Sequence, residues 1–438
     1  MEIDITTLKD LNIFGNDDQN CVFDKINFSR TSNGEAQLKQ KLSQPLNTLS
    51  SIQSVQRILK LILEYETAWP VSISNGTVLM TERFYETQLT SIPAKVNYQN
   101  AFFYKLLNSS DFSLIQFSVT HCFDFIKGMK VIANLFNQLS IPEILSEKIK
   151  EVSELIDKSE LKLIFENEQA KAFDNVQLLK LAYFLRYRFK QSMFKLLHIH
   201  AELDAWYAMA MAVKNLNLHF PDFETSEHPV LEMNGLYHPL LEHPVPYDVR
   251  MDEQKHFIFL TGANMAGKST FIKAVGIAIF LAHTGMGVPS RHMKLSKIDG
   301  MISNINIMDN ITKGESYFYN EVQRIKSTVT RINDGRKWLI LIDELFKGTN
   351  VEDAMKCSTI VIEGLLKIPY SLYILSTHLY EIGTPLKQHS NILFRYFETQ
   401  TINEEFSFSY ELKEGISNDR LGYLILKKEG VVKLLEGL

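Results

Sequence analysis

The chain has 438 residues, 45% of them hydrophobic and 22% charged, which is typical of a globular protein with two or three domains. A formal net charge of −5 excludes whole-chain attraction to nucleic acid, so any such binding requires a local basic patch. Three widely spaced cysteines, Cys21, Cys122 and Cys357, exclude a disulfide framework and a thiolate metal site. Because there is neither a signal-peptide pattern nor an apolar run of about 18 residues, we expect a cytoplasmic protein with no membrane partner.

Helical patterns dominate the chain up to about residue 216. Apolar residues recur three and four positions apart in residues 35–46, 51–65 and 142–165. A further run from Val176 to Leu216 has about 40 residues without Gly or Pro, which predicts a long helix that acts as a lever or strut. We therefore predict an all-α helical core or lever domain over residues 1–219.

The composition changes near residue 220, where prolines cluster between Pro221 and Pro246. Beyond this cluster, FIFLTG, WLILIDE and SLYILSTH are short β-rich runs, each followed by a turn or a helical pattern. Such alternation predicts an α/β domain with a buried, mostly parallel sheet, which we place over residues 220–438. Residues 406–412 alternate with period two and predict a half-buried antiparallel strand.

Residues 262–269, GANMAGKS, match the phosphate-loop pattern GxxxxGK[ST] between an apolar strand and a helix. Glycines let successive N–H groups face an anion, and the N-terminus of the following helix adds its dipole. Lys268 supplies a positive charge for the β and γ phosphates, and Ser269 can ligate Mg²⁺. The alternative is a Gly-rich turn without a ligand, but the flanking strand and helix favour the phosphate loop.

An acidic pair, Asp343 and Glu344, ends the WLILIDE run and so lies at the edge of the sheet where α/β proteins bind ligands. We expect Asp343 to orient Mg²⁺ and Glu344 to position or activate the attacking water. His378 ends the next β-rich run, where an imidazole could sense the γ-phosphate. The alternatives are an acidic pair that only caps the next helix and a histidine with a structural hydrogen bond.

Residues 314–316, Gly-Glu-Ser, precede an amphipathic helix and resemble the signature segment of ABC-type ATPases. That resemblance implies that the Ser316 hydroxyl contacts the γ-phosphate held by the opposite subunit. An ordinary helix N-cap explains Ser316 equally well.

Several segments together resemble the MutS family of DNA mismatch-repair ATPases in their order and spacing. They are TGANMAGKST, GMGVPS, DNITKGESYFYNEV, DELFKGTN and STHLYEI. The resemblance extends to AELDAWYAMA at 201–210, to the helical segment from residue 28, and to NDRLGYLILKKEGVV at 418–432.

This resemblance implies a dimeric ATPase with two composite sites that use ATP and Mg²⁺. It gives catalytic roles to Glu344, Lys268, His378 and Ser316. It places the metal at Ser269 and Asp343, the dimer seam at Gly348, Thr349 and Asn350, and adenine stacking at Tyr247. The implied phosphate loop comprises Gly262, Ala263, Asn264, Met265, Ala266, Gly267, Lys268, Ser269 and Thr270.

The sequence also departs from the family pattern. Mismatch readers of the family have an N-terminal domain with a Phe-x-Glu wedge before the helical core, whereas here the core resemblance begins by about residue 25. We therefore expect no such domain, a reduced or absent DNA clamp and no nuclease tail. Phe84-Tyr85-Glu86 mimics the wedge but lies within the core, which favours coincidence. Tyr317 follows Ser316 where threonine is usual, so the signature is altered.

Two weaker patterns lie in the long helical run. Basic residues alternate with aromatic residues between 183 and 195, a mixture that can hold nucleic acid, although Leu185, Phe189, Met193 and Leu196 predict a core stripe instead. The basic residues are Arg186, Arg188, Lys190 and Lys195. The pairs His198/Glu202 and His200/Asp204 have metal-ligand spacing, but we expect ordinary pairs on the helix surface.

We expect an ATP-switched homodimer in which closure of the nucleotide sites moves the helical levers and thereby grips or releases duplex DNA. Mismatched and branched duplexes are the candidate ligands. The alternative is a nucleotide-gated protein scaffold that binds no DNA, which the acidic net charge and the missing reader domain favour. A small-molecule kinase is disfavoured by the signature segment and by the long helices.

Overall fold

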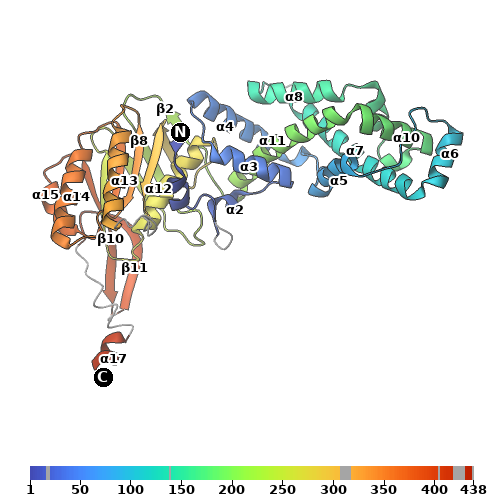
Figure 1. The fold of residues 1–438 in the computed structure, drawn as a ribbon. Helices are drawn as coiled ribbons and strands as arrows, with labels where there is room; N and C mark the ends of the chain where they lie inside the picture. The colour runs from blue at the N-terminus through green and yellow to red at the C-terminus, as the bar shows by residue number, and fades with distance from the viewer. Residues whose placement is uncertain (16–19, 138–139, 306–316, 403–404, 418–429, 437–438) are drawn as a thin grey trace. The chain divides into compact units, whose positions relative to one another are not determined.

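The computed structural model describes residues 1–15, 20–137, 140–305, 317–402, 405–417 and 430–436 (Figure 1). The contacts divide the chain into two compact units. We call Met1–Lys25, Gln44–Ile52 and Asn215–Leu438 the α/β unit, and Ile26–Ser43 with Gln53–Lys214 the helical unit. The chain is a mixture of helix and sheet, as expected. The single boundary near residue 220 stays a prediction, because both compact units draw on the first 52 residues.

Every regular element described in the helical unit is a helix or a short helical turn. The principal helices are α3 (Ser32–Ser43), α4 (Leu49–Glu64, which begins in the α/β unit), α5 (Asn75–Glu86), α6 (Tyr98–Leu107), α7 (Ser109–Phe136), α8 (Glu143–Ile156), α9 (Lys162–Glu166), α10 (Asn175–Tyr183) and α11 (Lys190–Asn215).

The long helix predicted near the end of this unit is interrupted once, between α10 and α11. Residues 184–188 form a π-helix, and the Phe189 N–H donates to the Phe184 carbonyl at 2.9 Å, five residues back. The predicted core stripe is confirmed, because all four of its members are buried: Leu185, Phe189, Met193 and Leu196.

The pair His200/Asp204 is buried, so the expectation of a surface pair is wrong here. The Asp204 carboxylate accepts hydrogen bonds from the Thr31 N–H at 2.9 Å, the Thr31 hydroxyl at 2.6 Å and the Arg30 N–H at 3.1 Å. It therefore fixes the chain just before α3. Burial lowers the pKa of His200 to about 4. The other pair, His198/Glu202, is in contact at 3.3 Å.

A seven-stranded sheet forms the centre of the α/β unit, in the order β1-β7-β8-β9-β5-β10-β11. Its strands are parallel except for the final pair, so the antiparallel strand predicted at 406–412 is confirmed within β11. The strands are β1 (Glu2–Ile3), β5 (Phe257–Thr261), β7 (Gly300–Asn304), β8 (Trp338–Asp343), β9 (Ser371–Ser376), β10 (Ile392–Ile402) and β11 (Glu405–Glu414).

The helix α12 (Lys268–His283) contacts β8 and β9 of this sheet and β3 of a second, four-stranded sheet. Beyond its first turns, every residue from 274 to 282 is apolar or glycine and buried, as expected of a helix enclosed between two layers. Gly276 permits this close packing, since a Cβ there would lie 2.6 Å from a methyl of Leu11 and 2.7 Å from one of Leu341. The second sheet has the order β2-β6-β3-β4, with β2 (Asp222–Glu224), β3 (Leu231–Leu236), β4 (Tyr247–Met251) and β6 (His292–Ser296).

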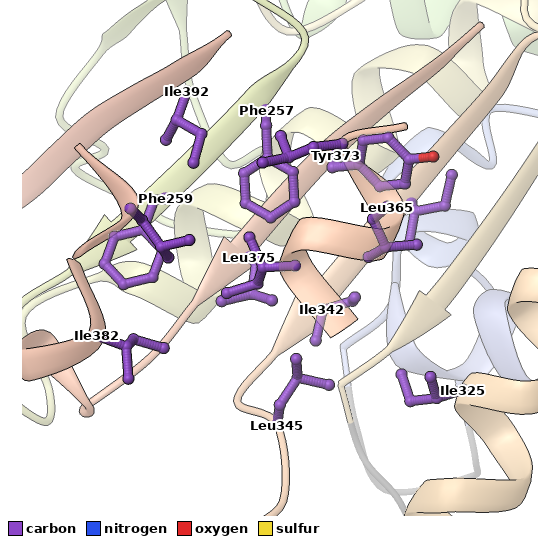
Figure 2. Close-up of a cluster of buried hydrophobic side chains, with 14 of the residues drawn as sticks. Phe257, Phe259, Ile325, Ile342, Leu345, Leu365, Tyr373, Leu375, Ile382 and Ile392 are labelled. Carbon is purple, nitrogen blue, oxygen red and sulfur yellow. The ribbon is translucent and has the colours of Figure 1, made fainter. Parts of the chain in front are cut away.

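Two further helices, α13 (Tyr317–Ile332) and α14 (Val351–Leu365), contribute to the apolar core on the other face of the large sheet. Alternate residues of β5, β8 and β9 point into this core because successive strand side chains face opposite sides. Figure 2 shows Phe257 and Phe259 near Leu375, with Ile325 from α13 near Ile342.

The first residues of the chain complete the large sheet, which the sequence did not predict. Glu2 pairs with Gly300, so β1 forms the edge strand beside β7. The helix α1 (Ile5–Asp10) follows and is tied to the end of β7: the Thr7 hydroxyl accepts the Ser303 N–H at 2.9 Å, and the Asp10 carboxylate accepts the Ser303 hydroxyl at 2.5 Å.

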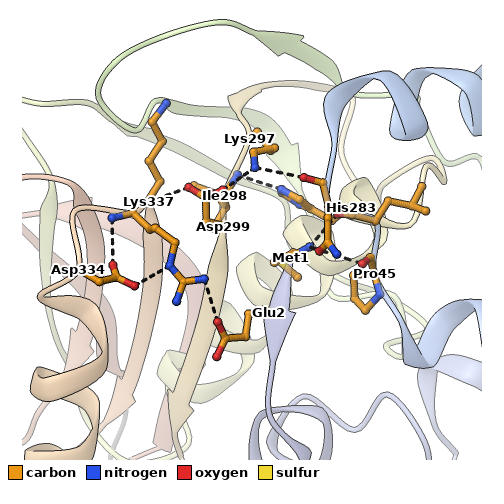
Figure 3. A network of polar contacts seen from close by, with 12 residues as sticks. Met1, Glu2, Pro45, His283, Lys297, Ile298, Asp299, Asp334 and Lys337 are labelled. Carbon is orange, nitrogen blue, oxygen red and sulfur yellow. Dashed lines mark hydrogen bonds and ion pairs between the residues drawn. The ribbon is translucent and has the colours of Figure 1, made fainter.

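Further polar contacts join β1 to the segments around residues 283–299 and 334–337 (Figure 3). Glu2 lies 2.9 Å from the Arg336 guanidinium, and Asp299 accepts from Lys297 at 2.5 Å and from the Lys337 N–H at 3.1 Å. The buried His283 accepts the Ile298 N–H at 3.0 Å. These contacts connect three segments of the α/β unit that lie far apart in the sequence.

Candidate functional site at the phosphate loop

The predicted phosphate loop connects β5 to α12 through a turn that requires unusual backbone angles. Gly262 has φ 141°, Met265 has φ 67° and Gly267 has φ 110°. Glycine suits the two ends because positive φ brings no Cβ clash there. At Gly262 a Cβ would also lie 3.1 Å from the Phe397 carbonyl oxygen. The loop therefore curls tightly before Lys268 begins the helix.

The Lys268 ammonium folds back over this loop. Its Nζ donates to the carbonyl oxygens of Gly262 and Ala263, each at 2.9 Å. The side chain is 5% exposed, and burial lowers its pKa from 10.5 to about 8, although Glu344 and Asp343 act in the opposite direction. A buried positive charge thus stands at the mouth of the loop.

Asp343 connects the loop to the carboxyl edge of the sheet. One carboxylate oxygen accepts the Ser269 hydroxyl at 2.5 Å, and the other accepts the Ser376 hydroxyl. The three residues come from the start of α12 and from the ends of β8 and β9. Parallel strands bring such ends to one edge, so a hydroxyl and a carboxylate face each other there.

Glu344 follows directly in a left-handed backbone conformation, with φ 67°. Its two carboxylate oxygens have different partners: Nε2 of His378 at 2.5 Å and Nζ of Lys347 at 3.0 Å. Burial acts to raise the pKa of Glu344, but the contacts with His378 and then Lys347 outweigh it and lower the pKa from 4.5 to about 2. Glu344 is therefore a carboxylate at neutral pH.

These groups share one cleft of about 740 Å³. The predicted site residues in its lining are Tyr247, Asn264, Met265, Gly267, Lys268, Ser269, Thr270, Asp343, Glu344 and His378. Gly262, Ala263 and Ala266 belong to the loop but are outside this lining, and the two alanines are buried. Ser316 lies outside the described residues.

Two tyrosines form part of the cleft wall. Tyr247 was predicted to stack on adenine; it is 5% exposed, and its ring packs edge-on against Phe271 and Phe397 at 5.4 and 5.7 Å. Tyr410 is 41% exposed and stacks on Phe408. The sequence did not single out Tyr410, which faces the cleft from an irregular stretch of β11 where φ is 55°. Base stacking by Tyr247 stays a prediction.

The segment predicted to line a dimer seam, 348–350, leads from the acidic pair into α14. Asn350 is the N-cap of that helix, and its side chain accepts the Asp353 N–H at 3.0 Å. This contact explains the asparagine locally. The dimer seam itself stays a prediction.

The basic side chains of residues 183–195 make contacts within the helical unit. Arg186 donates to the backbone carbonyls of Phe84 and Thr87, the latter at 2.6 Å, and so caps the end of α5. Lys195 pairs with Glu151. Arg188 and Lys190 lie over the rings of Tyr183 and Phe194. Phe84 is 1% exposed, so the Phe-Tyr-Glu tripeptide presents no aromatic wedge.

The segment that carries most of the cleft residues is similar to a domain of known proteins. Residues 258–434 match the family model of MutS domain V. This segment is similar to MutS domain V. The match begins within β5, includes the phosphate loop and the acidic pair, and extends past β11. The resemblance to the MutS family seen in the motifs is thereby confirmed.

Mismatch-repair proteins are among the similar sequences. The DNA mismatch repair protein MutS of Ehrlichia chaffeensis is 28% identical over 230 residues, which are 52% of this chain and 27% of the relative. The DNA mismatch repair protein MSH3 of Vanderwaltozyma polyspora is 28% identical over 273 residues, 59% of this chain and 25% of the relative. MutS of Petrotoga mobilis is 27% identical over 234 residues, 52% of this chain and 28% of the relative. The matches therefore span about a quarter of these relatives.

Across the parts of the chain that the structure describes, no helix has the length and hydrophobicity needed to cross a bilayer. The same residues contain no group of three or more His, Cys, Asp or Glu side chains placed to hold a metal ion.

Proposed function

We propose that the MutS domain V of this chain binds ATP with Mg²⁺ and hydrolyses the ATP to ADP and phosphate. The observation that carries the proposal is the contact of Ser269 with Asp343 at 2.5 Å beside Lys268. It joins the phosphate loop to the acidic strand end within one cleft. The MutS family is an ATPase family, which supports the same reaction.

The residues present fit both groups. The loop has curled backbone and a buried ammonium at its mouth, which suits an anionic phosphate chain. Ser269 and Asp343 supply hydroxyl and carboxylate oxygens, the ligands that Mg²⁺ prefers. Bound Mg²⁺ would neutralise negative charge on the phosphates. The cleft volume of about 740 Å³ lies within the usual range of small-molecule sites.

Hydrolysis requires a water oxygen to bond to the γ-phosphorus while the bond to the bridging oxygen breaks. Glu344 is ionised at neutral pH and can orient that water and take its proton. His378 and Lys347 hold both oxygens of this carboxylate. Lys268 stabilises the charge that develops on the phosphate oxygens. The contribution of the chain is therefore positioning and electrostatic stabilisation.

Calorimetric titration with MgATP and steady-state phosphate release test this proposal. Wild type should bind and turn over ATP, whereas Lys268→Ala should bind ATP at least about 100-fold more weakly because a charged contact to the phosphates is lost. Equal ATP affinity in the two proteins would reject the site.

We further propose that the chain acts as a homodimer with composite sites, in which Ser316 of one copy serves the nucleotide of the other. The resemblance of residues 314–316 to a signature segment supports this. Subunits carrying Ser316→Ala can be mixed with subunits carrying Lys268→Ala. A composite site predicts that mixing restores one functional site per dimer and raises activity above that of either variant alone. Activity equal to the sum of independent subunits would contradict the composite site.

Duplex DNA, mismatched or branched forms included, is the proposed ligand of the dimer, with residues 1–219 acting as a helical core and lever domain in the cytoplasm. The relatives named as DNA mismatch repair proteins support this. A binding panel of homoduplex, mismatch, junction and single strands tests it with and without an ATP analogue. Binding through several phosphates should weaken steeply as salt rises. No binding at low salt would leave the protein-scaffold alternative.

A further inference from the structure

A buried carboxylate, Glu321, lies one turn into α13 and points at the turn that follows the acidic pair. Its side chain is 2% exposed. One carboxylate oxygen accepts the Lys347 N–H at 3.2 Å and the other accepts the Gly348 N–H at 3.4 Å. Burial raises the pKa of Glu321 despite these N–H contacts. Burying a carboxylate costs folding free energy, so the contacts of Glu321 need an explanation.

The turn that it contacts is held in an unfavourable backbone conformation. Glu344 and Phe346 both have positive φ, 67° and 60°, and neither is glycine. Such residues cost about 1 kcal/mol or more each unless the surroundings hold them. The two outer residues of the turn, Glu344 and Lys347, line the cleft, while the two between them, Leu345 and Phe346, are buried. The conformation therefore aims Glu344 into the cleft.

Three contacts hold the turn in place. At its start the Glu344 N–H donates to the Ser376 carbonyl at 3.0 Å. At its end the amides of Lys347 and Gly348 meet Glu321, as described above. Between them, the ring of Phe346 packs against Phe318 of α13 at 5.7 Å. Figure 2 shows Leu345 and Ile325 of α13 at the same end of the apolar core. Thus α13 supplies two of the three anchors.

We propose that Glu321 is a positioning residue for ATP hydrolysis: by binding the two amides beyond the turn, it fixes the backbone of Glu344 and so the direction of that carboxylate. This inference rests on the proposed function. It also gives α13 a mechanical role, since a displacement of this helix would move the Glu344 turn with it. Glu321 itself does not line the cleft.

Hydrogen exchange of the full chain, followed on peptides covering 344–350, tests directly whether Glu321 holds this backbone in place. Glu321→Gln keeps the size of the side chain but replaces one acceptor oxygen by an amide that cannot accept. Glu321→Ala removes both acceptors. The matched control is Thr328→Val, because Thr328 is buried on the same helix and, among the residues that the structure describes, its hydroxyl donates to the Arg324 carbonyl at 2.9 Å.

We expect faster exchange at 344–350 in both Glu321 variants, and no change there in Thr328→Val. In parallel, kcat should fall about tenfold in Glu321→Gln and about 100-fold in Glu321→Ala, because small displacements of a catalytic group have costs of this size. ATP affinity should stay within about threefold of wild type, since Glu321 does not line the cleft.

Unchanged exchange at 344–350 in Glu321→Ala would overturn the inference, as would equal losses of kcat in Glu321→Ala and Thr328→Val. A different result would reject the proposed function but keep the structural role of Glu321. In that case the wild-type chain would bind no ATP, while both Glu321 variants would still exchange faster than wild type at 344–350. Hydrogen exchange thus tests the contact of Glu321 with the backbone, and ATP binding by the wild-type chain tests the proposed function.

Discussion

Glu344 and His378 lie 2.5 Å apart, carboxylate oxygen to Nε2, although they follow different strands of the large sheet. The contact is a main reason why the pKa of Glu344 is held at about 2 against the effect of burial. A carboxylate with so low a pKa is a weak base, but it stays ionised and can orient a water molecule by accepting a hydrogen bond from it. In the proposed reaction, His378 would therefore act through Glu344 as well as through its own position in the cleft.

Glu344→Gln removes that charge while keeping the shape of the side chain. We expect MgATP affinity to be kept and kcat to fall about 100-fold or more, the range associated with losing a general base. Single-turnover phosphate release measures the rate and calorimetry measures the affinity. Ordinary turnover in this variant would exclude Glu344 from the hydrolytic step.

ATP affinity should decrease above pH 8. The pKa of Lys268 is lowered to about 8 in the free protein, so its ammonium is increasingly neutral at higher pH. Bound phosphate favours the charged form, so binding at pH 9 should take up close to one proton, and Kd should rise about tenfold per pH unit above 8. Titration calorimetry in two buffers of different ionisation enthalpy measures the uptake.

Lys268→Arg is the control for this effect, because a guanidinium stays charged throughout the range. It should bind more weakly than wild type but without proton uptake at pH 9. Zero uptake by the wild-type protein would show that another group controls the pH dependence.

Asp343→Asn should raise the Mg²⁺ concentration needed for half-maximal hydrolysis. The amide keeps one oxygen for the Ser269 or Ser376 hydroxyl but removes the negative charge that attracts the cation. We expect a shift of about tenfold or more, the usual scale for losing a charged contact. A Mg²⁺ titration of phosphate release measures it. An unchanged titration curve would place the metal elsewhere.

Gly276→Val should destabilise the α/β unit. The new Cβ would lie within 2.7 Å of both Leu11 and Leu341, so the free energy of unfolding should fall by about 2 kcal/mol or more. Gly364 in α14 is the control position, because no atom of the described residues outside its own helix lies within 4 Å of a Cβ there. Gly364→Ala should be neutral or stabilising by up to about 1 kcal/mol. Urea unfolding measures both. Equal stabilities of the two variants would contradict the tight packing of α12.

Much of the site was predictable because its residues occupy ends of regular elements. Strong apolar runs identified β5, β8 and β9, and in a parallel sheet the residues after such runs meet at one edge. Lys268, Asp343 and His378 were therefore brought together in the prediction and lie in one cleft in the structure. The spacing of Gly262, Gly267 and Lys268 between an apolar run and a helical pattern located the turn that Lys268 closes.

The features that were not predicted depend on contacts between distant parts of the chain, which leave no pattern in the neighbouring sequence. The strand β1 has two residues, too few for any periodicity, and its partner β7 lies about 300 residues away. Tyr410 faces the cleft because the register between β10 and β11 shifts, which alternation cannot reveal. Glu321 looked like one more polar residue of an amphipathic helix, since its partners are backbone amides.

The pairing of Glu2 with Gly300 has a consequence for biosynthesis. At about 5–20 residues per second, a ribosome needs roughly 15–60 s to add the intervening stretch. During this interval the edge strand has no neighbour, whereas both segments of the helical unit, Ile26–Ser43 and Gln53–Lys214, are synthesised before Gly300. The large sheet of the α/β unit is thus completed late, and truncated translation products would expose an unfinished sheet.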